Sequence, residues 1–191
     1  MGGITLDDMK AAGSLLEGHF KLSSGLHSAR YLQCALYLSE PDRAEAAGRQ
    51  LAARLKNAGA HLVVSPALGG VIIGHEVARA LGVPFFFTER ADGPMELRRG
   101  FVLEPGTRVL VVEDVVTTGK STREVMNAVT QRGGVVVGVA SIVNRSGQEN
   151  PFTPLPFTAL LTVDVSAFPP ESCPLCAAGL PVVKPGSRPG A

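Results

Sequence analysis

Short runs of apolar residues alternate along this chain with segments in which apolar residues recur every three or four positions. Five runs are mostly apolar, as in strands buried on both faces: 61–65, 84–88, 108–112, 135–143 and 158–163. Three intervening segments have the spacing of amphipathic helices, and they end near Gly59, Gly82 and Gly133. This order predicts an α/β protein with a central, mainly parallel five-stranded sheet flanked by helices.

The clearest helix is expected over 39–59. Ser39 can cap its first turn together with Asp42 three residues later, and Pro41 lies where a missing N–H costs little. Gly59 then ends the helix.

Length and composition indicate the broad class of protein to which this chain belongs. With 191 residues, 45% of them hydrophobic, and a net charge of +1, the chain fits one globular domain over 1–191. Within it, about 1–38 and an extended tail over 165–191 are expected to be peripheral. The near-neutral charge speaks against nucleic acid and anionic membranes as partners. With three cysteines and no signal-peptide pattern, we expect a cytoplasmic protein.

The strongest chemical signal is the segment that links the third apolar run to the next helix. Glu113 and Asp114 stand at the end of the expected strand, where two carboxylates can hold the vicinal hydroxyls of a ribose or a hydrated Mg²⁺. The hydroxyls of Thr117, Thr118 and Ser121 follow, at the start of the helix. Together with backbone N–H groups they can converge on a phosphate.

Other interpretations of these residues are weaker. A Walker A loop needs a glycine five residues before Gly119, where this chain has Asp114. His75-Glu76 begins like a zincin motif, but Arg79 stands where the second histidine is required. A capped helix after an ordinary strand stays open as the simplest alternative.

The run from Glu113 to Ser121 resembles the phosphoribosyl pyrophosphate (PRPP) motif of type I phosphoribosyltransferases. The resemblance implies that family's fold, Mg²⁺ as cofactor, and acids that hold the ribose hydroxyls. The metal would be held mainly through PRPP, with Asp114 as a further candidate ligand, and Arg90 and Asp114 would be catalytic. The residues assigned to PRPP are Arg90, Glu113, Asp114, Val115, Val116, Thr117, Thr118, Gly119, Lys120 and Ser121.

Further segments resemble orotate phosphoribosyltransferases, and the similarity runs over about 20–188. The segment 20–31 is similar to their small hood over the base, in which many members have a Lys where this chain has Ser23; Lys21 lies on the same face. The turn after the first core strand looks like their pyrophosphate loop and consists of Ala67, Leu68, Gly69 and Gly70. The simpler alternative for the segment 20–31 is an edge strand followed by a turn. For 67–70 it is a tight strand-to-helix turn.

The base is indicated by Arg145, just beyond the fourth strand. In orotate phosphoribosyltransferases an Arg at this position binds the substrate carboxylate, and the residue that matches Thr117 also contacts the base. A planar guanidinium pairs well with a carboxylate, which purine bases lack. The resemblance therefore implies transfer from PRPP to orotate. A purine phosphoribosyltransferase and a non-catalytic PRPP-sensing regulator are the alternatives.

The polar segment 89–101 resembles the family's catalytic lid, which closes over pyrophosphate and is shared across a homodimer. Its cations are Arg90, Arg98 and Arg99. An exposed hairpin with ordinary surface charges is the alternative for the latter two.

Cys173 and Cys176 have the spacing of metal ligands. A closed zinc site needs four ligands, however, and the only other cysteine, Cys34, is distant in sequence. Half of an intersubunit site, a redox pair and a structural turn are all compatible with the spacing; we favour the structural turn.

Overall fold

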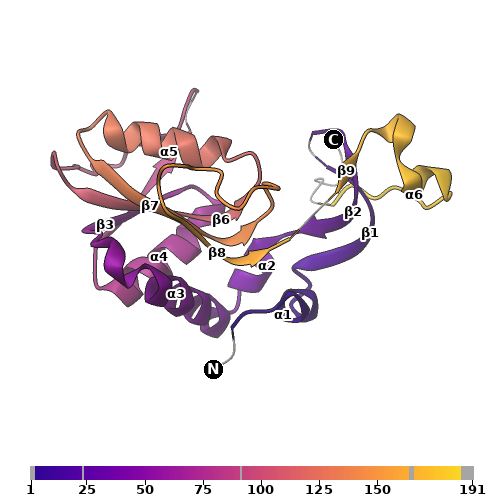
Figure 1. Ribbon diagram of the computed structural model, residues 1–191, viewed down its shortest axis with the longest axis horizontal. Coiled ribbons are helices and arrows are strands. Elements are labelled where there is room, and N and C mark those ends of the chain that lie inside the picture. Colours follow the sequence, from indigo (N-terminus) through magenta and orange to yellow (C-terminus); the bar gives the residue numbers. More distant parts are fainter. Residues whose placement is uncertain (1–2, 23, 91, 164–165, 186–191) are drawn as a thin grey trace. The chain divides into compact units, whose positions relative to one another are not determined.

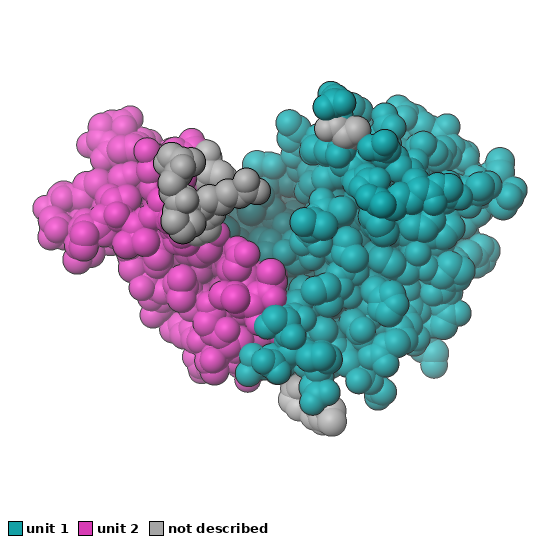
Figure 2. All heavy atoms as spheres, turned by 180° about the vertical axis from the view of Figure 1, so that it is seen from behind, with its two compact units in different colours: residues 1–4, 38–163 teal, residues 5–37, 164–191 magenta. Residues whose placement is uncertain are grey.

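The computed structural model describes residues 3–22, 24–90, 92–163 and 166–185. Its contacts divide the chain into two compact units, teal and magenta in Figure 2. Unit 1 comprises residues 1–4 and 38–163, and unit 2 comprises residues 5–37 and 164–191. The single domain over 1–191 stays a prediction.

Unit 1 is built on a six-stranded sheet with the strand order β5-β4-β3-β6-β7-β8. The strands are β3 (Leu62–Pro66), β4 (Phe85–Glu89), β5 (Glu96–Leu97), β6 (Arg108–Val116), β7 (Val135–Asn144) and β8 (Phe157–Thr162). Five of them are parallel, which confirms the predicted sheet. The additional β5 pairs antiparallel with β4 at the edge. Its two residues are too few to produce a period in the sequence.

Helices cover both faces of this sheet. They are α3 (Pro41–Leu55), continued by the 3-10 turn Lys56–Ala58, α4 (Gly69–Leu81) and α5 (Lys120–Thr130). Figure 1 shows α3 and α4 on one face and α5 on the other. None of the helices in the described part of the chain is both long enough and apolar enough to cross a membrane.

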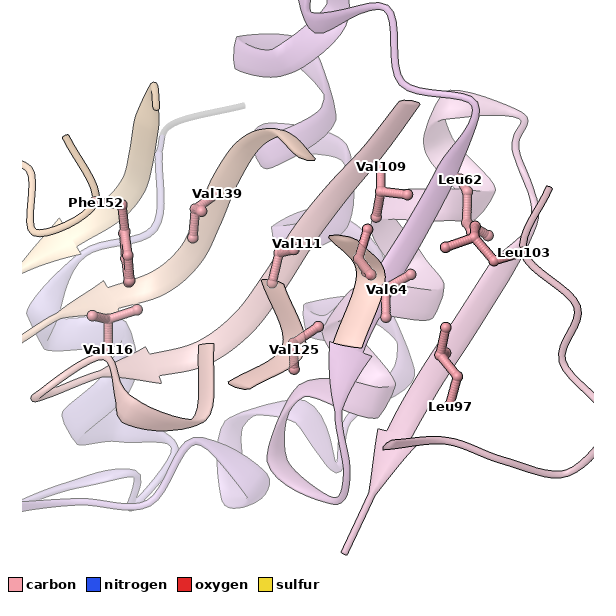
Figure 3. Packing of buried hydrophobic residues seen from close by; sticks show 11 residues of the cluster. Leu62, Val64, Leu97, Leu103, Val109, Val111, Val116, Val125, Val139 and Phe152 are labelled. Carbon is pink, nitrogen blue, oxygen red and sulfur yellow. The ribbon is translucent and has the colours of Figure 1, made fainter. Parts of the chain in front are cut away.

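Strand alternation divides the core of unit 1 between these two faces. Val64 of β3 and Val111 of β6 belong to the cluster that includes Val125 of α5, as Figure 3 shows. The residues beside them in the strands, such as Val63 and Leu110, are equally buried and point to the opposite face. Near-continuous apolar strands are therefore a consequence of the two helical layers.

The start of α3 differs from the expected one. Its N-cap is Glu40 rather than Ser39, and this cap makes no side-chain hydrogen bond. Because Pro41 disfavours the helical conformation in the residue before it, Glu40 is extended, with φ −91° and ψ 113°. The proline thus sets the boundary. At the other end, Gly59 adopts the left-handed conformation, with φ 61°, as expected for a stop.

Unit 2 contains a three-stranded antiparallel sheet with the order β1-β2-β9. Its elements are α1 (Leu6–Ala11), β1 (Leu15–Lys21), β2 (His27–Leu32), β9 (Ala167–Phe168), the 3-10 turn Pro170–Ser172 and α6 (Pro174–Ala177), and α2 (Cys34–Leu38) follows β2. The tail over 165–191 is therefore not simply extended in its described part, because it contains a 3-10 turn and α6. Residues 165 and 186–191 lie outside the described residues.

The α3/α4 face of the sheet provides a test of the packing. Ile73 of α4 is fully buried, whereas its neighbour Ile72 is 43% exposed. We expect Ile73→Ala to lower the free energy of unfolding by about 2–5 kcal/mol, because it removes buried methyl groups and leaves a cavity. Ile72→Ala, the matched control on the same helix, should cost less than about 1 kcal/mol. Urea denaturation followed by circular dichroism measures both; equal losses would contradict this packing.

Candidate active site

The two acidic residues, expected at the end of the strand, lie within β6. The strand continues beyond the expected end at 112 as far as Val116, because it stays paired with β7 up to the pair Val116↔Asn144. Glu113 pairs in register with Ser141 and is only 5% exposed. The loop that is expected to bind phosphate is correspondingly shorter than predicted. It runs over 117–119 between β6 and α5.

Burial dominates the electrostatics of this pair. Removal from water raises the pKa of Glu113 to about 8, and the charge of Asp114 adds to the rise. Burial also raises the pKa of Asp114. Ser121 Oγ donates to Glu113 Oε2 at 2.9 Å, and the Val115 N–H donates to Asp114 Oδ1 at 2.8 Å. The pair is therefore suited to hydroxyl donors or to a cation, either of which would favour its ionised form.

The turn after β3 lies close to these acids. Because β3 and β6 are parallel neighbours, their carboxyl ends meet at one edge of the sheet. A Cβ atom on Gly69 would lie 2.8 Å from Asp114 Oδ1, so only glycine fits there without movement of the carboxylate. A Cβ on Gly70 would lie 3.1 Å from the carbonyl oxygen of Val112. The glycines thus permit a close approach of backbone to acid.

A cavity of about 190 Å³ lies at this edge. Its lining joins both predicted segments and consists of Pro66, Ala67, Gly69, Met95, Glu113, Asp114, Val115 and Ser121. The structure therefore brings the expected pyrophosphate turn and the acidic pair to one hollow. Met95, which the sequence reasoning missed, is 8% exposed, and its backbone N–H donates to Glu124 Oε2 at 3.4 Å. An apolar residue in a polar segment was the available signal.

A second hollow, of about 340 Å³, lies between α3 and α4. Its charged side chains already pair with one another, for example Arg49 with Glu45 and Arg79 with Glu76. Neither predicted segment contributes to its lining, which comprises Glu45, Arg49, Glu76, Arg79 and Ala80. It is therefore not the candidate site.

Phe152 and Arg123 pack against the expected phosphate loop. Gly119 caps α5 in the left-handed conformation, with φ 71°, and a Cβ there would lie 3.0 Å from the ring of Phe152. Arg123 lies over the same ring, with 5.1 Å between guanidinium carbon and centroid, and donates to the Thr118 carbonyl at 2.9 Å. Thr117, the first residue of the loop, is exposed. The end of the loop next to α5 is thus packed against Phe152 and Arg123, and its first residue is open to solvent.

The expected lid is a short hairpin in its described part. Arg90 forms an ion pair with Glu124 of α5 and donates to the Gly93 carbonyl at 3.1 Å. It therefore lies against α5 and does not line the 190 Å³ cavity. Arg99 forms an ion pair with Glu89 at 2.9 Å, and its guanidinium holds the pKa of that carboxyl below its usual range.

Arg145 follows the end of β7, as expected. Its backbone N–H donates to the Val116 carbonyl at 2.7 Å, next to the first residue of the phosphate loop. The Asn144 side chain steadies the turn, since its Oδ1 accepts from the Ser146 N–H at 3.0 Å. Arg145 does not line the cavity either.

The expected hood belongs to unit 2. Lys21 is exposed at the end of β1. Ser23 in the hood and Ala91 in the lid lie outside the described residues.

Comparison with known proteins identifies the family. Residues 37–154 match the phosphoribosyl transferase domain. An orotate phosphoribosyltransferase of Carboxydothermus hydrogenoformans is 58% identical over 177 residues, which cover 92% of each chain. This chain belongs to the orotate phosphoribosyltransferase family.

Solved structures agree with this assignment. That of the Mycobacterium tuberculosis orotate phosphoribosyltransferase in complex with Fe(III) dicitrate is 26% identical, with a TM-score of 0.67 over 82% of this chain and 97% of the other. The adenine phosphoribosyltransferase of Thermoanaerobacter pseudethanolicus has a TM-score of 0.68 over 83% and 100% of the chains, at 18% identity. The latter likeness shows the fold alone, so the backbone does not distinguish the base.

The raised pKa of Glu113 predicts a pH-dependent cost to stability. Between its ordinary pKa of 4.5 and its folded-state pKa of about 8, the unfolded chain ionises this carboxyl while the folded chain keeps it protonated. Its contribution to stability is therefore lost as the pH rises through this range. We expect the free energy of unfolding of the parent protein, minus that of Glu113→Gln, to fall between about pH 5 and about pH 8.

Urea denaturation at the two pH values, without added divalent cations, measures this difference. Glu104→Gln, at an exposed position, is the matched control. A constant difference between parent and Glu113→Gln would contradict the raised pKa.

Proposed function

We propose that this chain transfers the ribose 5-phosphate group of PRPP to a ring nitrogen of orotate, giving orotidine 5′-monophosphate and pyrophosphate in pyrimidine biosynthesis. The bond from the anomeric carbon to pyrophosphate breaks, and a bond to the orotate nitrogen forms. The observation that carries the proposal is the meeting of the buried acids of β6 with the glycine turn after β3, in a chain of this family.

PRPP is assigned to the carboxyl ends of β3 and β6. The acids Glu113 and Asp114 accept hydrogen bonds from the two ribose hydroxyls, which compensates their burial. The 5-phosphate takes the backbone N–H groups and hydroxyls of the phosphate loop, where the partial positive charge at the start of α5 favours it. Backbone N–H groups of the turn that contains Gly69 face pyrophosphate.

The donor set in the cavity fits a magnesium ion. Oxygen donors are the ligands that Mg²⁺ prefers, and here two carboxylates stand together without a basic side chain in the cavity lining. Mg²⁺ held mainly by PRPP, with Asp114 as a further ligand, would supply positive charge for the departing pyrophosphate. This chain's residues orient the sugar.

Orotate is assigned to the carboxyl end of β7. As the resemblance to orotate phosphoribosyltransferases implies, its carboxylate is assigned to the Arg145 guanidinium and its ring to Thr117. The backbone of Arg145 is hydrogen-bonded to the residue before Thr117, which supports placing both residues at one end of the sheet. An anionic base and an anionic sugar donor must be held side by side, which makes positioning the main task of the protein.

The hairpin 89–101 is assigned the role of a lid. As the anomeric carbon gains positive character, the growing charge on pyrophosphate requires donors, and Arg90 is the candidate. To reach the anion it must leave Glu124, with which it pairs in this structure. Closure also excludes water, which would otherwise capture the cationic carbon. We further propose a homodimer that shares this lid.

Ultraviolet monitoring of orotate consumption tests the function. With PRPP and Mg²⁺, we expect turnover of orotate and none of adenine, guanine or xanthine. Turnover of a purine with orotate inert would make the chain a purine enzyme. Tight PRPP binding without turnover of any base would favour a regulator.

Asp114→Asn tests the role of this carboxylate in the same assay. It keeps the shape of the side chain but removes a charge from the diol site, so we expect a loss of turnover on the order of 100-fold with an unchanged circular dichroism spectrum. Near-normal turnover would remove Asp114 from the site.

Arg145→Ala tests the assignment of the base. Loss of a charged hydrogen-bonded pair should raise the KM for orotate by roughly 10- to 100-fold and leave the KM for PRPP within about threefold. Arg49→Ala, which removes an exposed arginine on α3, should change neither constant. Equal effects of Arg145→Ala on both substrates would contradict its contact with orotate.

A further inference from the structure

Unit 2 gathers four metal-binding side chains that the transferase chemistry does not use. They are His19 of β1, His27 of β2, and the pair Cys173 and Cys176 around the start of α6. Their ligand atoms all lie within 4.8 Å of one another. Two short chain segments about 150 residues apart in sequence thus meet at one point, through their sulfur and nitrogen atoms.

The distances within the cluster match a tetrahedral coordination shell. With metal–nitrogen bonds of about 2.0–2.1 Å and metal–sulfur bonds of about 2.3 Å, ligand nitrogen and sulfur atoms lie about 3.6 Å apart. Here His19 Nε2 lies 3.6 Å from Cys173 Sγ and 3.7 Å from Cys176 Sγ, and His27 Nδ1 lies 3.3 Å from Cys176 Sγ. The two nitrogens are 2.9 Å apart, a few tenths of an ångström short of tetrahedral spacing.

The protonation of His19 suits a ligand. Its Nδ1 lies 2.8 Å from the carbonyl oxygen of Leu180, and since a carbonyl only accepts, Nδ1 carries the proton. With the proton on Nδ1, the neutral form of the ring presents the lone pair of Nε2 to the cluster. A backbone carbonyl that fixes the tautomer in this way is the usual outer partner of a metal-bound histidine.

The local structure aims these side chains at one another. The pairing of β1 with β2 is irregular between Glu17 and Phe20, and this bulge lets His19 and Phe20 both be buried, against the alternation of a regular strand. His27 begins β2 directly across the hairpin from Lys21. Three of the four ligands are almost fully buried, with exposures of 3% for His19, 6% for His27 and 2% for Cys173.

From this geometry we propose that His19, His27, Cys173 and Cys176 bind one zinc ion, which ties the tail to the β1–β2 hairpin. Two thiolates and two neutral imidazoles balance the charge of a divalent ion, so the buried site is neutral overall. Tetrahedral sites with two sulfur and two nitrogen ligands are typical of zinc. All four positions are taken by protein, as in structural rather than catalytic sites.

A bound zinc ion would also stabilise this small unit. It comprises roughly 60 residues, a size at which a hydrophobic core alone supplies little stability and metals or disulfides often add to it. In the described residues, backbone contacts between its tail and the hairpin include the short pairing of β9 with β2 and two hydrogen bonds of Val183, which accepts from the Lys21 N–H and donates to the His19 carbonyl, both at 2.8 Å. Zinc binding at this site does not depend on the proposed transferase activity or on its substrates.

Metal analysis of the full-length protein tests the proposal. The protein is produced without a polyhistidine tag, purified under reducing conditions and dialysed, and its zinc is measured by mass spectrometry. We expect about one zinc per chain. Cys176→Ser and His27→Gln should retain less than a tenth of that, because a three-ligand site binds zinc far more weakly. Cys34→Ala and His61→Gln, which change the same residue types outside the cluster, should retain it.

Cobalt substitution guards against variants that fail to fold. Co²⁺ added to the chelator-stripped parent protein should produce the intense visible absorption of a tetrahedral ion, together with thiolate-to-cobalt charge transfer, at a ratio of one per chain. Zinc should then abolish the signal. A parent protein that holds less than about a tenth of a zinc per chain and produces no such spectrum would overturn the proposal. So would a Cys173–Cys176 disulfide in protein alkylated at lysis.

Discussion

The burial of two adjacent carboxylates at the end of the central strand is the constraint on which unit 1 depends. Glu113 is almost fully buried because β6 continues its pairing with β7 past the acids. That burial raises the pKa of both carboxyls, so the pair requires hydroxyls or a cation to be fully ionised. The neighbouring residues accommodate the acids. Ser121 of α5 donates a hydrogen bond to Glu113, and Gly69 leaves room where any Cβ would meet Asp114.

The proposed zinc site in unit 2 solves a similar problem with different donors. At the end of β6, hard oxygen atoms face a hollow that suits a sugar diol or Mg²⁺. In the hairpin and tail, sulfur and imidazole nitrogen atoms converge within 4.8 Å of one another. Donor softness and coordination number therefore separate an open binding site from a closed structural one. Both gather residues from separate segments of the chain.

Much of unit 1 was predictable from local pattern, and the errors have identifiable causes. The five parallel strands and the glycine stop at Gly59 were predicted correctly because each depends on neighbouring residues. The cap at Ser39 was wrong because Pro41 controls the conformation of Glu40. β6 was predicted too short because charged residues ended the apolar run, whereas pairing with β7 carries the strand on to Val116.

The sequence by itself determined what depends on spacing along the chain: the buried strands, the helices between them, and the motif of two acids and three hydroxyls. Tertiary structure decided what depends on meetings between distant segments. It brought Gly69 close to Asp114 and paired Arg90 with Glu124. It also gathered two histidines and the cysteine pair in one cluster. The four ligands could not be grouped from sequence, because a lone histidine carries no spacing signal and only the fold brings β1 and β2 beside the tail.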